Sequence, residues 1–432
     1  MARAPRLAGP VAGLADSGAA LLLVAWSLLT LGDSLNRGDW ELSALILLLA
    51  GFAVVIAVAW RRMPLGVPRR QDLIVPVATC VLAAIAHPVA ASMQLSGGRL
   101  VAVQAGAAAA AVSAAAGLAL WPRGQRLALA ATALLAVVTA SLVFAFVPHP
   151  DIDVWAILQQ SSTGLVHGAD MYRQHWIDGF GLKAVYPYLP WSTVVVLPFH
   201  LVFGDVRVAM LVALLVAAWL LRRMAPAAPA ALASLVLVAP HFPYYLVRSW
   251  TEPTLTVLLF AALLLIARGH PGWAAVALAV ALASKQPIVL LLPVFAVWPS
   301  FGWRRTLASV GLAVALVAPW LIAGPRDFWH DAVSANLALR PIDRALSVPS
   351  GLHHVGIDLG FGLLLAVLIG VYALVWWRVP RSVSGLALAC GLVVCGYDLA
   401  NTQSFFNHYQ LAASLLVAAT ALAGLGDRSP AG

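Results

Sequence analysis

Charged side chains are scarce in this chain. Lys, Arg, Asp and Glu together make up 10% of its 432 residues, against roughly 25% in ordinary globular proteins. The basic residues are almost all arginines, because Lys183 and Lys285 are the only lysines. So little charge excludes a set of water-soluble domains, although the length alone would allow two or three of them.

Cysteines and enzyme motifs of soluble folds are also few. The three cysteines, Cys80, Cys390 and Cys395, lie inside apolar runs without the spacing of metal ligands, which indicates small buried hydrophobes. The His353–His354 pair has no third ligand at the spacing of a zinc site. No phosphate-binding glycine loop, dinucleotide-binding fingerprint or Ser-His-Asp order occurs. No resident metal site is therefore expected from these residues.

What the chain has in abundance is apolar sequence. Hydrophobic residues make up 62% of it, and apolar runs of about 20 residues recur along its length. This pattern predicts an all-α fold, a polytopic bundle of about 12 to 14 transmembrane helices. The formal net charge of +9 indicates arginine-rich cytoplasmic loop ends beside anionic lipid, not nucleic-acid binding. The richness in alanine and arginine suggests a bacterial coding sequence, and hence the bacterial plasma membrane.

The arginine-rich loops divide the chain into alternating spans. Residues 1–124 predict an N-terminal module of four spans, and residues 125–432 a second membrane region with a large outer loop at 148–191. The expected spans have these approximate ranges: 18–31, 42–60, 73–93, 100–120, 127–147, 193–221 (bent at Gly204-Asp205), 231–240, 255–266, 273–284, 288–297, 307–322, 359–377, 386–399 and 411–423.

The loop 148–191 is the longest polar stretch, and it begins with Asp151 and Asp153. A carboxylate just beyond a span can be partly desolvated and still reach water, which suits a general base. An Asp-x-Asp pair also suits a divalent cation shared with a phosphate-bearing ligand. The alternative is that both acids mark a solvated loop start. The following residues, Val154 to Leu165, have the spacing of an interfacial amphipathic helix that ends at Gly168.

Aromatic residues gather where the chain re-enters the membrane. Tyr172 lies in the loop, and Tyr186, Tyr188 and Trp191 lie at its end beside Pro187 and Pro190. Such residues are typical of an interfacial belt. They would also form the walls of a substrate cleft for a sugar or a lipid head group, so both interpretations stay open.

The order of these residues resembles a known family. Asp153-Val154-Trp155, then Gly168-x-x-x-Tyr172, then Tyr186-Pro-x-x-Pro190 is similar to membrane glycosyltransferases of the GT-C class, most of all the polyprenol-phosphate-mannose-dependent group of family 87. Tyr188 stands where the family commonly has a second proline. The resemblance implies an inverting hexosyltransferase with Asp153 as general base. It implies a polyprenyl-phosphate sugar donor, a glycolipid or glycan acceptor of the cell envelope, and an extracytoplasmic active site.

That reaction needs cations to bind the leaving phosphate. The candidates expected on the same face are Arg248, Lys285 and His408. Lys285 interrupts an apolar stretch, and an ionisable residue at membrane depth suggests function. Its alternative is a structural pair with an acid such as Glu252, which is itself a candidate cleft residue. Arg248 could equally be an interfacial arginine, and His408 a hydrogen-bonded interfacial histidine.

A transporter or flippase for lipid-linked sugars is the alternative function. It would share the short, broken helices around Lys285. The long outer loop distinguishes the two functions, because transporters concentrate their polar groups at the membrane midplane.

Overall fold

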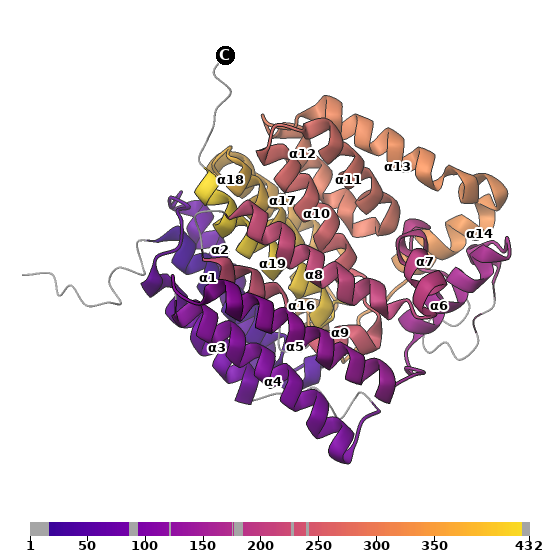
Figure 1. Ribbon diagram of the computed structural model, residues 1–432. Helices are drawn as coiled ribbons and strands as arrows, with labels where there is room; N and C mark the ends of the chain where they lie inside the picture. Colours follow the sequence, from indigo (N-terminus) through magenta and orange to yellow (C-terminus); the bar gives the residue numbers. More distant parts are fainter. Residues whose placement is uncertain are drawn as a thin grey trace, which may run out of the picture.

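The computed structural model describes residues 17–85, 94–120, 122–174, 176, 185–225, 229–238 and 242–425, and every regular element within them is a helix (Figure 1). Apolar runs form helices because a backbone surrounded by lipid or packed side chains must bond its own N–H and C=O groups. The predicted all-α fold class is therefore confirmed for these residues.

The helices have the following bounds: α1 Gly18–Gly32, α2 Leu42–Trp60, α3 Ile74–Ile85, α4 Gly97–Ala119, α5 Gln125–Phe146, α6 Asp153–Val166, α7 Trp191–Phe203, α8 Arg207–Met224, α9 Phe242–Arg248, α10 Glu252–Ala267, α11 Pro271–Ser284, α12 Leu292–Val297, α13 Trp303–Ala323, α14 Pro325–Trp329, α15 Ala335–Leu337, α16 Val348–His353, α17 Gly360–Arg378, α18 Val383–Ala400 and α19 Phe406–Leu422. Short 3-10 turns join several of them, among them η3 (Met171–Arg173), η4 (Ala230–Val236) and η5 (Gln286–Leu291).

Seven helices in the described part of the chain are long and apolar enough to cross a membrane. Two bent pairs, α7 with α8 and α9 with α10, raise the number to nine if each pair is one span. The expected 12 to 14 spans are thus too many for the described residues. The excess comes from short apolar helices such as α1, whose 15 residues extend for only about 22 Å where a bilayer needs about 30 Å.

Local breaks occur where the sequence predicts them. α6 ends at Val166, and Gly168 follows with a φ of +75°. Gly204, with a φ of +74°, separates α7 from α8, which meet at an angle of 111°. Only glycine adopts such a φ without a steric cost. Lys285 is extended between α11 and η5, so the predicted interruption at Ser284–Pro287 is also confirmed.

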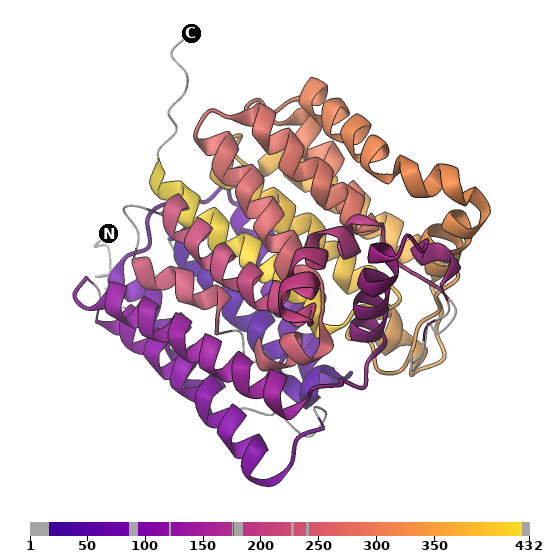
Figure 2. The same cartoon turned by 45° about the vertical axis from the view of Figure 1, so that its right-hand side comes forward.

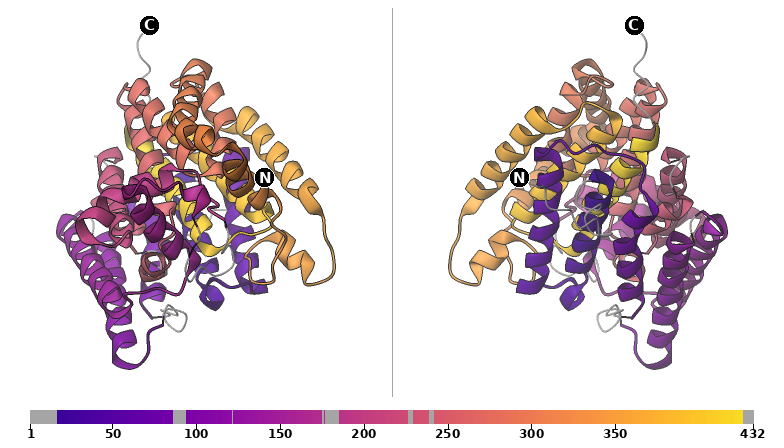
Figure 3. Two further views of the ribbon diagram at one scale, coloured as in Figure 1. Left: turned by 90° about the vertical axis from the view of Figure 1, so that its right-hand side faces the viewer. Right: turned by 90° about the vertical axis from the view of Figure 1, so that its left-hand side faces the viewer.

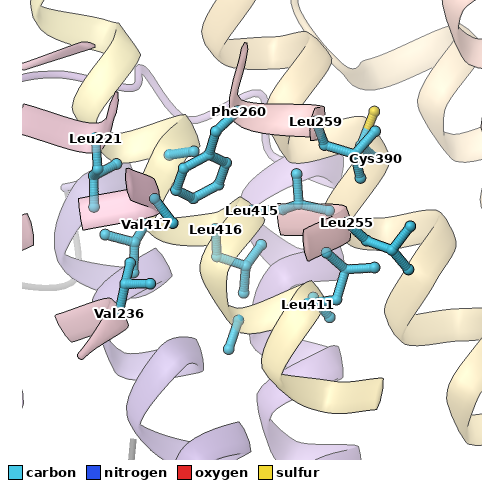
Figure 4. Packing of buried hydrophobic residues seen from close by; sticks show 14 of the residues in the cluster. Leu221, Val236, Leu255, Leu259, Phe260, Cys390, Leu411, Leu415, Leu416 and Val417 are labelled. Carbon is cyan, nitrogen blue, oxygen red and sulfur yellow. The ribbon is translucent and has the colours of Figure 1, made fainter. Parts of the chain in front are cut away.

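One hydrophobic core runs through the bundle. Its centre is formed by α8, η4, α10, α18 and α19, with Phe260 and Leu416 among the side chains that meet there (Figure 4). α1 packs against both α2 and α19, and α4 lies along α5. The predicted boundary at residue 124 therefore falls between two helices in contact within a shared core. In Figure 3, α4 and α5 form one flank of the bundle and α17 the other.

The two ends of the bundle differ in charge. The antiparallel course of the helices places Arg62, Arg126, Arg223, Arg304 and other arginines at one end, which we call the basic end. All acids of the described residues except Asp72 lie toward the opposite end, which we call the acidic end. Charge is thus distributed across the bundle in the way expected of a membrane protein with one cytoplasmic face.

A small outer layer covers part of the acidic end. It consists of α6, η3, the start of α7 and α14, which gather at the right of Figure 1 and come to the front in Figure 2. It has its own hydrophobic cluster, formed by Ile157, Met171, Tyr172, Trp176, Tyr186, Phe328 and Ala332. Residues 175 and 177–184 of the predicted outer loop lie outside the described residues.

Candidate active site

Asp153 is the first residue of α6, at the acidic end of the bundle. Its Oδ1 accepts a hydrogen bond of 2.8 Å from the backbone N–H of Val154, and the helix dipole favours a carboxylate there. Burial raises the pKa of Asp153, and the Val154 N–H and the charge of Arg248 oppose that rise. The side chain is half-buried. Asp153 therefore accepts a proton more readily than an ordinary aspartate and can still meet a substrate.

Asp151 lies in the bend before α6 and is exposed. The two carboxylates of the Asp-x-Asp pair therefore have different surroundings, since only Asp153 belongs to the helix. Across the described ranges, no group of three His, Cys, Asp or Glu side chains is placed to hold a metal ion. The geometry of these residues thus offers a divalent cation no ready set of protein ligands.

Arg248 ends α9 at the sharp bend before α10, where Ser249 has a φ of +54°. Its guanidinium lies 4.8 Å from the centre of the Tyr244 ring and donates a 2.6 Å hydrogen bond to the Tyr244 hydroxyl. These two contacts hold the cation in place. Its charge lowers the pKa of Asp153, so these two predicted site residues are within electrostatic reach of each other.

Lys285 and Glu252 form a buried ion pair. Glu252 begins α10 and Lys285 follows the last residue of α11, and these antiparallel neighbours place both residues at the acidic end. The side chain of Glu252 is 2% exposed and that of Lys285 15% exposed. Lys285 thus makes the ion pair with Glu252 that the sequence offered as its structural role. A buried ion pair needs such direct contact, because each isolated charge would be costly to desolvate.

His408 and Asp398 extend this pair into a cluster. The Nε2 atom of His408 lies 3.7 Å from Glu252 Oε1, and its Nδ1 lies 3.8 Å from Asp398 Oδ1. We call Glu252, Lys285, Asp398 and His408 the ionic cluster. Asp398 was not predicted as a site residue, although an acid in the last turn of an apolar run is the signal that singled out Lys285.

Tyr188 interacts electrostatically with both Asp153 and the Glu252 of the ionic cluster. Burial raises the pKa of its hydroxyl, and the negative charges of Asp153 and Glu252 raise it further, so both carboxylates are within electrostatic reach. Its backbone carbonyl accepts a 2.9 Å hydrogen bond from the Tyr172 hydroxyl. The side chain is partly exposed. Among the predicted cleft tyrosines, Tyr188 is therefore the one that keeps exposed surface.

Tyr172 and Tyr186 pack inside the outer layer instead. They are 5% and 0% exposed, and their rings meet edge to face at 5.3 Å. The Tyr186 hydroxyl bonds Thr193 Oγ1 at 2.6 Å. Tyr172 and Tyr186 thus fill the hydrophobic cluster of the outer layer and have little surface left for the predicted contact with a substrate. Trp191 is partly exposed, and its indole N–H bonds the Leu316 carbonyl at 3.1 Å.

The segment that follows α11 is hydrogen-bonded to the outer loop. Gln286 Nε2 donates to the carbonyls of Pro187 and Ala332 at 2.9 and 2.8 Å. Ser192 Oγ and the backbone N–H of Leu189 donate to the Ser284 carbonyl at 2.7 and 3.3 Å, and a carbonyl at a helix end needs such partners from outside its helix. These contacts fix Lys285 against the loop segment that carries Tyr188. The site is thus assembled from the outer layer and from the ends of α9, α10, α11, α18 and α19.

Comparison with models of protein families, with curated proteins and with solved structures found no match to this chain.

Proposed function

We propose that this chain is a membrane glycosyltransferase that transfers a hexose, mannose being the first candidate, from a polyprenyl-phosphate donor to a glycolipid or glycan acceptor. One observation carries the proposal: Asp153, a half-buried carboxylate of raised pKa, is within electrostatic reach of the Arg248 cation, and Tyr188 is within electrostatic reach of both Asp153 and Glu252. A base next to a cation is what a sugar transfer from a phosphate requires.

In this proposal Asp153 is the general base. The acceptor hydroxyl attacks the anomeric carbon of the sugar and gives its proton to the Asp153 carboxylate. The bond between the anomeric carbon and the phosphate oxygen breaks, and its electron pair leaves with the polyprenyl phosphate. Attack opposite the leaving group inverts the configuration at the anomeric carbon. The raised pKa of Asp153 favours this step, since a stronger base takes the proton more readily.

Arg248 is the main phosphate-binding candidate. Its bonds to Tyr244 occupy one of its N–H donors and one face of the guanidinium, and five donors are available in total. Lys285 and His408 differ from Arg248 as phosphate-binding candidates, because both already contact the carboxylate of Glu252. Lys285 keeps N–H donors beyond the one given to Glu252, so it can bind a phosphate oxygen while it remains paired.

The distribution of charge supports an extracytoplasmic site. Arginines at the basic end fit the cytoplasmic face of a bacterial plasma membrane, and Asp153 lies at the other end of the bundle, so we assign it to the extracytoplasmic side. No nucleotide sugar is supplied there, so a lipid-linked donor fits that side better. The bilayer also delivers such a donor directly to the outer layer.

Transport of a lipid-linked sugar is the second candidate. The two helix pairs bent by 111° and the buried charges of the ionic cluster favour it, because transporters bind at broken helices. Proteoliposomes loaded with a fluorescent polyprenyl-phosphate sugar separate the two functions. Movement of the donor across the bilayer without any acceptor would favour transport, and sugar transfer only in the presence of an acceptor favours the enzyme.

The decisive experiment replaces Asp153 with asparagine. Purified protein would be reconstituted with a panel of radiolabelled polyprenyl-phosphate sugars and membrane glycolipids as acceptors. Asp153→Asn should lower turnover by about 100- to 10,000-fold. Its elution from a size-exclusion column should match that of the unaltered protein, which shows that it still folds. Asp151→Asn is the matched control, since it removes a carboxylate two residues away that is exposed. Full turnover of Asp153→Asn, or loss confined to Asp151→Asn, would contradict the assignment.

A further inference from the structure

Tryptophans and arginines gather at the basic end where α2 and α17 end beside each other. We call this cluster the Trp–Arg seam: it consists of Trp60, Arg61 and Arg62 from the end of α2, and of Trp376, Trp377, Arg378 and Arg381 from the end of α17. Trp60 is 57% and Trp377 71% exposed. Large aromatic side chains at helix ends with this exposure are typical of the boundary between lipid tails and head groups.

Hydrogen bonds fix two arginines of the seam on α17. Arg62 donates to the Trp377 carbonyl at 2.6 Å, and Arg381 donates to the Trp376 carbonyl at 3.0 Å. These carbonyls belong to the last turn of α17, where a helix leaves its carbonyls unbonded. Arg62 reaches its partner from a backbone with a φ of +51°, which is uncommon for any residue but glycine. Each of these bonds takes one of five guanidinium donors.

Two arginines of the seam lie over tryptophan rings. Arg378 lies 4.5 Å from the centre of the Trp60 ring, and Arg381 lies 4.9 Å from the ring centre of the buried Trp298. Stacking occupies a face of a guanidinium and leaves its N–H edge available for a planar or tetrahedral oxyanion. Capping of α17 therefore accounts for Arg62 and Arg381, but not for Arg378 and the exposed tryptophans.

No carboxylate of the described residues neutralises the seam. Asp72 is the sole acid described at the basic end, and its Oδ2 accepts hydrogen bonds from the Arg69 N–H and the Ser17 hydroxyl at 2.8 and 3.3 Å. The helices of the seam continue into exposed apolar side chains, with Ile46 on α2 55% and Ile369 on α17 60% exposed. Positive charge above two apolar helix faces complements a phosphate that carries acyl chains.

We propose that the Trp–Arg seam is a binding site for an anionic glycerophospholipid of the surrounding bilayer. Its phosphate is bound by the free N–H edges of Arg62 and Arg378, with Arg61 and Arg381 adding charge. Trp60 and Trp377 hold the glycerol region, and the acyl chains lie along α2 and α17. This site is at the opposite end of the bundle from Asp153 and does not depend on the sugar-transfer reaction.

The test compares lipids and variants on the full chain. Purified protein is first delipidated and then placed in nanodiscs of phosphatidylcholine. These nanodiscs are titrated with phosphatidylglycerol or, for comparison, with further phosphatidylcholine. Native mass spectrometry counts bound lipid, and hydrogen–deuterium exchange locates it. Phosphatidylglycerol should bind in preference and should slow exchange in residues 58–64 and 374–382. Arg62→Gln with Arg378→Gln should weaken its binding about tenfold or more.

Arg222→Gln with Arg223→Gln is the matched control. It removes the same charge from the same end, and Arg223 lies 5.1 Å from the ring centre of the exposed Trp219, so it also breaks an arginine–tryptophan contact. This control should change phosphatidylglycerol binding less than twofold. Equal weakening by both double variants would overturn the proposal, because binding would then follow general charge. Equal binding of both lipids by the unaltered chain, or protection away from the two segments, would overturn it as well.

Discussion

The two ends of the helix bundle differ in how their charged side chains are stabilised. At the basic end, exposed arginines cap helix carbonyls and stack on tryptophans, as Arg381 does on Trp298. At the acidic end, charges of both signs are buried in contact with one another, as Glu252 and Lys285 are. Exposed charges remain hydrated and change stability little, whereas buried ones depend on their partners. Burying charge at the acidic end thus costs free energy of desolvation, and such a cost is expected where charged groups have a function.

Breaking the buried pair should have the largest effect on stability. Glu252→Gln leaves the Lys285 ammonium buried without its carboxylate, and such a loss costs about 3–5 kcal/mol. Chemical unfolding in detergent micelles, followed by circular dichroism, measures the change in the free energy of unfolding. The matched variant at the basic end is Arg305→Gln, which loses an exposed donor to the Phe301 carbonyl and should cost about 1 kcal/mol or less.

The double variant Glu252→Gln with Lys285→Met checks the cause. Removal of both charges should restore part of the lost stability, because no ion is then left without a partner. If the double variant is as unstable as Glu252→Gln alone, packing rather than charge holds these helix ends together, and the contrast between the two ends fails.

A second pair of variants compares burial within the acidic end. Arg207 is 1% exposed, bonds both Asp205 oxygens and donates to the Val147 carbonyl at 2.7 Å, so it joins α5 to α8. Arg207→Gln should cost about 2–4 kcal/mol. Arg173 forms a 2.8 Å pair with Asp327 in which both side chains are roughly half exposed, so Arg173→Gln should cost less than about 1 kcal/mol. The same unfolding assay measures both, and similar losses would contradict the role given to burial.

The acidic end also shows how far the sequence predicts this molecule. Helix breaks at Gly204 and Lys285 were predicted, because a glycine between apolar runs or a lone charge inside one is a local signal. Asp153 could be placed at a span end by its neighbours alone. The pair of Lys285 with Glu252 was one of two alternatives from the sequence, and the sequence could not decide between them, because the contact depends on α10 and α11 lying antiparallel.

The burial of individual aromatic residues could not be predicted from the sequence either. Tyr186 and Tyr188 are two residues apart, so their local patterns are nearly the same, yet Tyr186 is fully buried and Tyr188 is partly exposed. The difference arises from α14 and the segment that follows it, where Asp331 Oδ2 accepts a 2.8 Å hydrogen bond from the Tyr186 N–H. Contacts between segments so distant in the chain leave no signal in a single sequence.

The pH dependence of turnover should report the cation beside Asp153. A general base works when ionised, so activity should fall as the pH drops through the raised pKa of Asp153. Arg248→Gln removes a charge that lowers this pKa, and the acid limb of the pH–rate profile should therefore move to higher pH. Arg248→Lys keeps the charge and should shift the limb less. An acid limb that stays in place in Arg248→Gln would show that the two groups are not coupled.

The same raised pKa has a consequence for stability. A carboxyl group that binds its proton more tightly in the folded state adds stability below its unfolded-state pKa. That contribution is lost as the pH rises through the folded-state pKa. Asp153→Asn should therefore flatten this part of the stability profile, and unfolding at several pH values measures it. An unchanged dependence of stability on pH would mean that burial does not raise the pKa of Asp153.

The smallest expected effects come from two tyrosine hydroxyls bonded to backbone carbonyls. Tyr172 donates to the Tyr188 carbonyl at 2.9 Å in the outer layer, and Tyr372 donates to the Leu290 carbonyl at 2.7 Å inside the bundle. Replacement by phenylalanine should cost about 1 kcal/mol of stability at either position, since one hydrogen bond is lost in each case. Only Tyr172→Phe also removes a hydrogen bond to Tyr188, which is within electrostatic reach of Asp153 and Glu252. Its turnover should fall about fivefold while that of Tyr372→Phe stays unchanged, so equal turnover in the two variants would separate Tyr188 from the reaction.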